Sequence, residues 1–298
     1  MSSVAPRHLA SRAPPAAWEA YLVIGVFPAG ERLRWCKAHV FVGSARPGWR
    51  CLSAVEALDG PGEAAFLTGD ERGVTRHTWA LDGSTCARDR NGWRIEAPLL
   101  RWAGWPRTHV AIDEPRVELG ATVRDVGWWA RIPRVLSYFT GFGDLSLRRA
   151  GDASAIRGVG LVEHAWGADV PFDPASLGPR RWQWDVLTCS EGGVAGALTI
   201  AGLGVRTMGR LRPGEPFATG WRARVRVREW REEVGRRAPL RWEGTMSIGA
   251  GTLRYEARAA TPVSAVVPGG GFLGTSWEGE WAGSSVSGTG FTEYRASS

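Results

Sequence analysis

The sequence predicts an all-β protein, and three observations support this fold class. Apolar and polar residues alternate over short runs such as AYLVIGVF (20–27), ARVRVREW (223–230) and TLRYEARA (252–259). These runs end at Gly, Pro or Asp-Gly and recur at spacings of roughly 8–15 residues, as in antiparallel barrels and sandwiches. Helical periodicity is scarce, and no strand–helix–strand rhythm is present. We therefore expect antiparallel sheets and not a parallel α/β fold.

The same alternation places further strands along the chain. It recurs in CKAHVFVG (36–43), RWQWDVLTC (181–189) and LRWEGTMSI (240–248). The segments LSAVEAL (52–58) and DPASLGP (173–179) are the places where a short helical turn is expected. No short repeat is visible, so neither a propeller nor a solenoid is predicted.

The chain of 298 residues is long enough for two medium-sized domains. The segment RRAGDASAIRG (148–158) is polar, contains glycines and has no periodicity, which is typical of a domain boundary. We predict one β domain over 18–150 and a second over 151–298. Residues 1–17 are rich in proline and alanine, and they are predicted to form a disordered lead-in.

The net charge of +7 raises the question of a nucleic-acid partner. Lys37 is the only lysine, and the other 36 basic residues are arginines, a bias typical of a GC-rich genome. In the densest basic run (221–237), Arg224, Arg226 and Arg228 alternate with apolar residues, as on the solvent face of a strand, and two glutamates follow this alternation. We therefore expect no nucleic-acid partner, while contact with a membrane surface stays open.

Neither a metal nor a cofactor is expected. The four cysteines, Cys36, Cys51, Cys86 and Cys189, form no CxxC or Cys–His cluster. The GVGLVE segment has Glu163 where a dinucleotide-binding loop needs its third glycine. No signal-peptide core and no run of about 20 apolar residues is present, so we expect a cytoplasmic protein with reduced thiols.

The stretch GVGLVEHAWG (158–167) carries a glutamate, a histidine and a tryptophan within four positions. As a strand it would direct His164 and Trp166 to one face and Glu163 to the other. One of these polar groups would then point into a barrel. It could be a hydrogen-bonded core group, a catalytic group or a metal ligand. The metal reading has less support, because His164 has no ligand-type residue two positions further on.

Three further stretches mix large aromatic residues with carboxylates on neighbouring strand positions. They are RRWQWDVL (180–187), TSWEGEWAG (275–283) and SGTGFTEYR (287–295). A carboxyl desolvated against indole rings has a raised pKa and can act as an acid. Indole faces stabilise a carbocation. This combination favours proton-initiated chemistry on an apolar alkene, namely hydration, isomerisation or cyclisation.

GVGLVEHAWG resembles the G-x-(G/A)-(Y/L)-x-(D/E)-H-x-W-G signature of the two-domain lipocalin-like (calycin) superfamily. This group includes carotenoid 1,2-hydratases (hydroxyneurosporene synthases), kievitone hydratase-like proteins and decalin-forming Diels–Alderases. The ending SWEGEWAGSSVSGTGFTEYR and the segment YFTGFGDLSL (138–147) are also similar to the superfamily, so the resemblance covers roughly 138–298. Glu163 stands at the common Asp of the signature and Ala165 at its usual Asn, which puts the substrate and the reaction in question.

The resemblance implies two lipocalin-like barrels or sandwiches and an apolar ligand of isoprenoid or polyene type. We expect a cofactor-independent hydratase or cyclase of secondary metabolism, with a non-catalytic lipid or pigment carrier as the alternative. A pericyclic reaction would need only conformer templating by the aromatic walls. The candidate catalytic residues are Glu163, His164 and Glu278. The candidate substrate-binding residues are Trp166, Trp182, Trp184, Asp185, Trp277, Tyr138 and Tyr294.

Overall fold

The computed structural model describes residues 18–295, with gaps. The gaps are 29, 32, 44–49, 53–56, 60–61, 82–85, 90–91, 98–99, 104–106, 114–115, 133–135, 168–181, 201–203, 234–235 and 265–269. The predicted lead-in (1–17) and the segment 173–179 therefore lie outside the described residues. Every regular element that is described is a strand, which confirms the all-β prediction.

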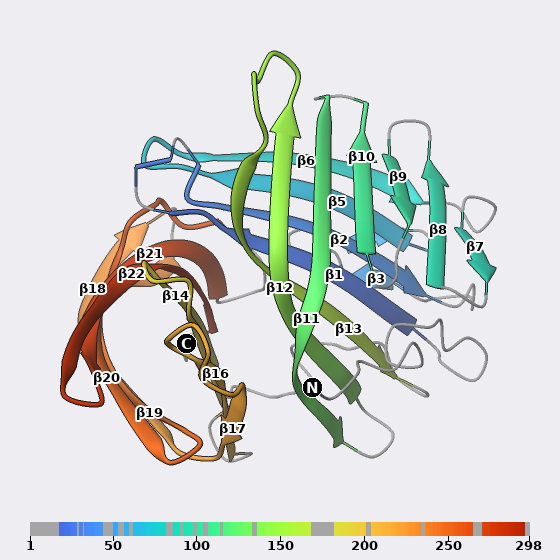
Figure 1. The fold of residues 1–298 in the computed structure, drawn as a ribbon. Helices are drawn as coiled ribbons and strands as arrows, with labels where there is room; N and C mark the ends of the chain where they lie inside the picture. The colour runs from blue at the N-terminus through green and yellow to red at the C-terminus, as the bar shows by residue number, and fades with distance from the viewer. Residues whose placement is uncertain are drawn as a thin grey trace. The chain divides into compact units, whose positions relative to one another are not determined.

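The first sheet has eleven strands in the order β6-β5-β2-β1-β13-β12-β11-β10-β9-β8-β7 (Figure 1). Its strands are β1 (Trp18–Val26), β2 (Trp35–Gly43), β5 (Gly62–Gly69), β6 (Val74–Leu81), β7 (Cys86–Asp89), β8 (Gly92–Ala97), β9 (Leu100–Ala103), β10 (Arg107–Ile112), β11 (Val117–Ile132), β12 (Leu136–Arg149) and β13 (Ile156–Gly167). A separate ribbon pairs β3 (Arg50–Leu52) with β4 (Ala57–Asp59).

The second sheet has nine strands in the order β17-β16-β15-β14-β22-β21-β20-β19-β18 and curls into a half-barrel (Figure 1). Its strands are β14 (Trp182–Cys189), β15 (Val194–Ile200), β16 (Gly204–Arg210), β17 (Ala218–Gly220), β18 (Ala223–Glu233), β19 (Arg236–Ile248), β20 (Gly251–Ala259), β21 (Gly270–Trp281) and β22 (Ser284–Arg295). All the strand pairs whose register is known are antiparallel, from β14–β15 to β21–β22.

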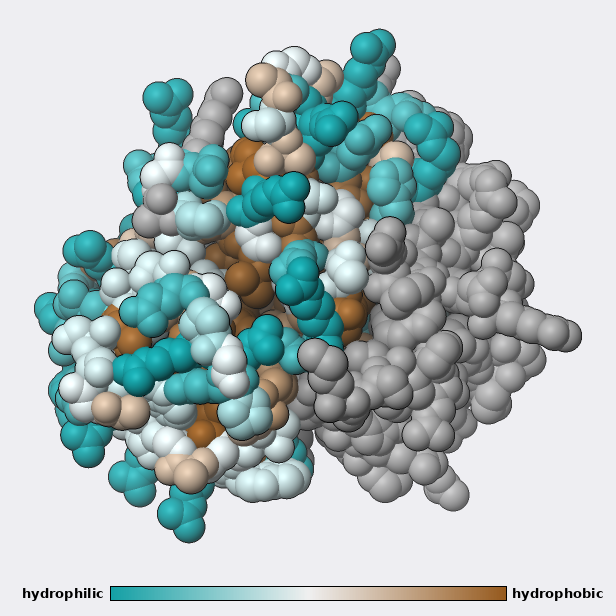
Figure 2. Space-filling model, in the orientation of Figure 1, coloured by the Kyte–Doolittle hydropathy of each residue, from teal (hydrophilic) through white to brown (hydrophobic). Residues whose placement is uncertain are grey.

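Alternation along the strands of the half-barrel separates an apolar inner face from a polar outer face. In β20 every second side chain is buried, from Leu253 through Tyr255 to Ala257, while the residues between them are exposed. The inner residues form one core cluster that includes Leu187, Trp242, Trp277 and Tyr294. Figure 2 shows mainly hydrophilic residues over β18–β20, which agrees with this pattern.

By its internal contacts the chain divides into two units, and their limits differ from the predicted ones. The first unit comprises Met1–Gly25, Lys37–Leu67 and Arg76–Asp173, and the second comprises Val26–Cys36, Thr68–Thr75 and Pro174–Ser298. Two segments from the N-terminal part of the chain thus belong to the unit that contains the half-barrel.

Trp35 is the centre of the contact that holds the segment Val26–Cys36 in the second unit. Its indole is completely buried, lies 4.5 Å from the ring of Phe272, and donates a hydrogen bond to Thr261 Oγ1 (3.2 Å). Gly274 faces this indole, and a Cβ there would come within 2.7 Å of it, so a side chain would displace the ring. The Thr289 hydroxyl donates to the carbonyl of Phe27 nearby (2.8 Å).

The segment 148–158 is the turn between paired strands and not a linker between domains. β13 pairs with β12 along its length, so the strand with the superfamily signature lies in the first sheet instead of opening the second domain. The turn is held by Asp152, whose carboxylate accepts the backbone N–H of Arg149 (3.0 Å). Polar, glycine-containing turns and interdomain linkers have the same composition, which explains why the sequence pattern predicted a boundary at this turn.

Candidate functional site

The signature strand β13 brings its two polar residues into the interior of the first unit, on opposite faces of the sheet. Glu163 lies directly opposite Thr140 of β12, and His164 lies opposite Phe139. All four side chains are buried. The imidazole of His164 stacks on the ring of Tyr21, with centroids 4.4 Å apart and planes 12° from parallel. The opposite orientation of Glu163 and His164 is the one that the alternation predicted.

A second buried polar group lies inside the half-barrel, at Asp185 of β14. Its carboxyl is completely buried and receives hydrogen bonds from three side chains. Thr292 Oγ1 donates to Oδ1 (2.6 Å), and the hydroxyl of Tyr255 donates to Oδ2 (2.6 Å). Gln183 Nε2 donates to both oxygens (2.9 and 3.0 Å). Three strands, β14, β20 and β22, therefore converge on one carboxyl.

The strand register explains how these residues meet. Asp185 and Thr292 are directly opposite each other on β14 and β22. Tyr255 reaches the carboxyl from β20, where glycines occupy the opposed positions on both neighbouring strands, Gly244 on β19 and Gly279 on β21. The phenol leans over Gly244, where a Cβ would lie 2.4 Å from its oxygen. Gly244 thus gives the phenol the room to reach Asp185.

Burial raises the pKa of Asp185 above its ordinary value, because the ionised carboxyl loses its hydration. The hydrogen bonds from Gln183, Thr292 and Tyr255 offset part of this rise; the indole N–H of Trp242 also opposes it but lies outside hydrogen-bonding geometry. Burial, reinforced by the charge of Asp185, raises the pKa of Tyr255 well above its ordinary value. The phenol therefore stays protonated and remains a donor.

Asp185 is expected to make the protein less stable as the pH rises. Between its ordinary pKa of 3.8 and its raised pKa, the folded protein holds a proton that the unfolded chain has released. The free energy of unfolding therefore falls with rising pH across this window. Melting curves of the wild type and Asp185→Asn from pH 4 upward should show this fall only in the wild type. A difference between the two proteins that does not change with pH, or that changes in the opposite direction, would contradict the raised pKa.

The other residues predicted to bind substrate fall into two groups. Trp184, Trp277 and Tyr294 are buried in the second unit, and Trp182 is half-buried there. The Trp277 indole N–H is shared between the carbonyls of Thr188 and Thr289 (3.1 Å each). Trp166 and Tyr138 lie in β13 and β12, but their side chains are outside the described residues.

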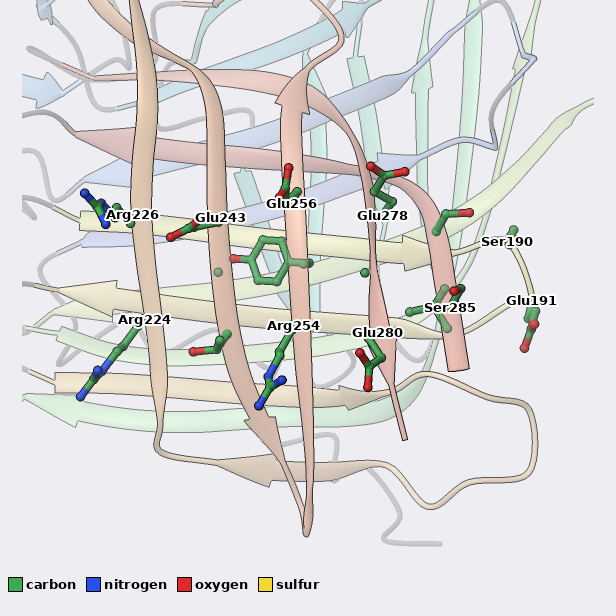
Figure 3. A pocket seen from close by; sticks show the side chains of 16 residues that line it. Ser190, Glu191, Arg224, Arg226, Glu243, Arg254, Glu256, Glu278, Glu280 and Ser285 are labelled. Atoms are coloured by element: carbon green, nitrogen blue, oxygen red, sulfur yellow. The ribbon is translucent and has the colours of Figure 1, made fainter. Parts of the chain in front are cut away.

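Glu278 was predicted to be an acid desolvated against a tryptophan, but its side chain is not buried. It is exposed on the outer face of β21, whereas Trp277 next to it is buried on the inner face. Its carboxyl lines an open trough of about 940 Å³ across β18–β22, where it lies near Glu256 and Glu280 (Figure 3). Arginines and glutamates line this trough, so an apolar substrate is not expected there.

Sequence reasoning did not find Tyr21, Tyr255 or Thr292. The protein has only four tyrosines, and this scarcity is the one sequence signal that could have pointed to Tyr21 and Tyr255. Tyr255 lies 70 residues from Asp185 in the sequence, so no local pattern connects the two. Thr292 is directly opposite Asp185, but the pairing of β14 with β22 is decided only by the fold.

The described part of the chain has neither a metal-binding cluster nor a membrane-spanning helix. It contains no group of three or more His, Cys, Asp or Glu side chains placed to bind a metal ion. Among the same residues there is no helix with the length and apolarity that crossing a bilayer requires.

Two antiparallel β units, each with buried polar groups among aromatic side chains, define the class of the protein. The fold is that of the two-domain lipocalin-like proteins, as the sequence predicted. No protein-family model matches the chain, and no curated protein sequence matches it.

Solved structures similar to this chain belong to the same fold class. A protein assigned as an AttH from Nitrosomonas europaea has a TM-score of 0.68 at 11% identity, over 100% of this chain and 99% of its own. Kievitone hydratase from Nectria haematococca has a TM-score of 0.57 at 13% identity, over 98% and 92%. CghA in complex with Sch210972 has a TM-score of 0.56 at 14% identity, over 95% and 89%.

Proposed function

We propose that the protein is an enzyme of the hydratase or cyclase type that acts on an apolar metabolite, with the carboxyl of Asp185 as the acid. The observation that carries this proposal is a completely buried carboxyl with a raised pKa inside an aromatic-lined half-barrel. Desolvation of this kind favours the protonated form of a carboxyl, which is the form that an acid catalyst needs. The folds of kievitone hydratase and CghA add support by similarity.

The residues around Asp185 fit proton transfer to an alkene. The acid proton passes from Asp185 to one alkene carbon, a carbocation forms at the other, and the aspartate is left ionised. Water then adds to the cation and loses a proton to the carboxylate, or a second double bond attacks the cation to close a ring, and the new cation loses a proton to the carboxylate. The hydroxyls of Thr292 and Tyr255 can both donate and accept, so they accommodate either form of Asp185.

Aromatic side chains of the same apolar cluster would stabilise the cation. Trp242 and Trp277 belong to the cluster that contains Tyr255, the direct partner of Asp185. An indole face contributes about 0.5–2 kcal/mol to the binding of a cation, more where water is excluded. Since Asp185 is completely buried, the reaction requires this cluster to give way to the ligand.

We propose Glu163 and His164 as a second group of site residues, in the first unit. Their burial and the stacking of His164 on Tyr21 fix both side chains in one orientation. A rigid polar group in an apolar interior suits the orientation of a ligand's polar end as well as proton transfer. Glu163→Gln and His164→Gln belong in the activity assay below for this reason.

A non-catalytic carrier of a lipid or pigment is the second candidate function. One observation favours it: both oxygens of Asp185 already have hydrogen-bond donors, from Gln183, Thr292 and Tyr255. Such a network is sufficient for a purely structural role, in which the carboxyl holds three strands together and transfers no proton.

The test uses apolar extracts of the producing cells as the substrate mixture. The protein is incubated with the extract in ordinary water and in water labelled with ¹⁸O, and the products are followed by mass spectrometry. A hydratase adds the mass of one water, with the label, to one component; a cyclase changes a component's retention time and leaves its mass unchanged. A component that binds and is recovered unchanged would establish the carrier and contradict the enzyme.

A further inference from the structure

Trp221 is the only large hydrophobic side chain that is exposed among the residues the structure describes. With 66% of its surface accessible, it lies in the short link between β17 and β18. The guanidinium of Arg206 stacks over its ring at 3.9 Å. Among the tryptophans whose side chains the structure describes, Trp79, Trp182 and Trp230 are half-buried and the others are buried, so only this indole is left in water, beside a cation.

Two more arginines follow Trp221 along the chain, and neither forms an ion pair with a described carboxylate. Arg222 and Arg224 are both exposed. Arg224 lies opposite Thr245, and the carbonyl of Arg222 accepts the N–H of Ser247. We call Arg206, Trp221, Arg222 and Arg224 the Trp221 patch.

Two arginines farther along the outer wall are paired with glutamates. Arg228 pairs with Glu243 at 2.6 Å, and Arg241 pairs with Glu256 at 2.7 Å. Figure 3 shows Arg224 at one end of the trough, away from Glu278 and Glu280. Arg222 and Arg224, which directly follow the exposed indole, form no such ion pair among the described residues.

We propose that the Trp221 patch docks the protein on the surface of an anionic lipid bilayer. An indole with one apolar face and a polar N–H favours the interface between headgroups and acyl chains. Arginines next to it would bind lipid phosphates and gain from the negative surface potential. Docking through this patch does not depend on the acid role of Asp185. It would bring the protein to the bilayer, where apolar metabolites dissolve.

The limited extent of the patch favours a bilayer over a nucleic acid. A nucleic-acid strand follows a continuous basic groove and stacks successive bases on several aromatic side chains. Within the described part of the chain one indole is exposed, and Glu243, Glu278 and Glu280 interrupt the arginines on the neighbouring strands. A contact of a few side chains with lipid headgroups needs no such continuity.

Co-sedimentation with vesicles tests the proposal on the full chain. Vesicles of phosphatidylcholine with added phosphatidylserine should bind the protein, whereas vesicles of phosphatidylcholine alone should bind it weakly. The double variant Arg222→Gln/Arg224→Gln should need about 30-fold more anionic lipid for half-binding, since each arginine near such a surface contributes about fivefold. Trp221→Ser should also weaken binding, and salt should weaken it further for the wild type.

The matched control is Arg72→Gln/Arg148→Gln, which removes the same charge from two exposed positions elsewhere. This control should bind like the wild type, and circular dichroism should show that all variants are folded. Absence of binding to the anionic vesicles would overturn the proposal. So would an equal loss in the control, or binding of single-stranded DNA through the same arginines without any vesicle binding.

Discussion

Asp185→Asn is expected to lower turnover by about 10²–10⁴-fold, the usual contribution of general acid catalysis. Asparagine has nearly the same shape and can still accept hydrogen bonds from Thr292 and Tyr255, but it has no proton to transfer. The measurement is single-turnover conversion of the substrate found in the extract assay, with the fraction of folded protein determined separately. Ligand binding should be largely retained.

The control for this prediction is Glu278→Gln, because Glu278 carries a carboxyl on the exposed outer face. It should turn over like the wild type. If Asp185→Asn also retains normal turnover per folded molecule, Asp185 only joins β14, β20 and β22, and the acid mechanism is wrong. A large loss in Glu163→Gln or His164→Gln alone would then move the chemistry to the first unit.

Trp35→Ala is expected to destabilise the second unit by about 3–5 kcal/mol, because it leaves a cavity where a large ring is completely buried. The variant also loses the hydrogen bond to Thr261 and the contact with Phe272. Thermal unfolding followed by circular dichroism should show a midpoint lower by roughly 10 °C. This test examines directly whether the segment Val26–Cys36 is part of the folded second unit.

Trp221→Ala is the matched control for Trp35→Ala, since it removes the same side chain from an exposed position. Its effect should stay within about 0.5 kcal/mol, as for most surface substitutions. Equal stability of Trp35→Ala and the wild type would show that the segment packs loosely against β21.

The sequence by itself determined the fold class and the face on which most side chains lie. Alternation with a period of two is a local property of a half-buried strand, so it is visible without knowing the partner strands. It correctly placed Glu163 and His164 on opposite faces of their strand, and the same alternation accounts for the burial of Trp277 beside the exposed Glu278.

Only the tertiary structure decided which strands are neighbours, where the units divide and which carboxyl is desolvated. The turn at 148–158 has the composition of a linker, and only the pairing of β12 with β13 shows that it closes a hairpin. Trp35 lies 226 residues from Thr261 in the sequence, and Tyr255 lies 70 residues from Asp185. Burial and pKa depend on every chain segment that packs around a group, and strand pairing is non-local. No pattern in a short window can therefore reveal them.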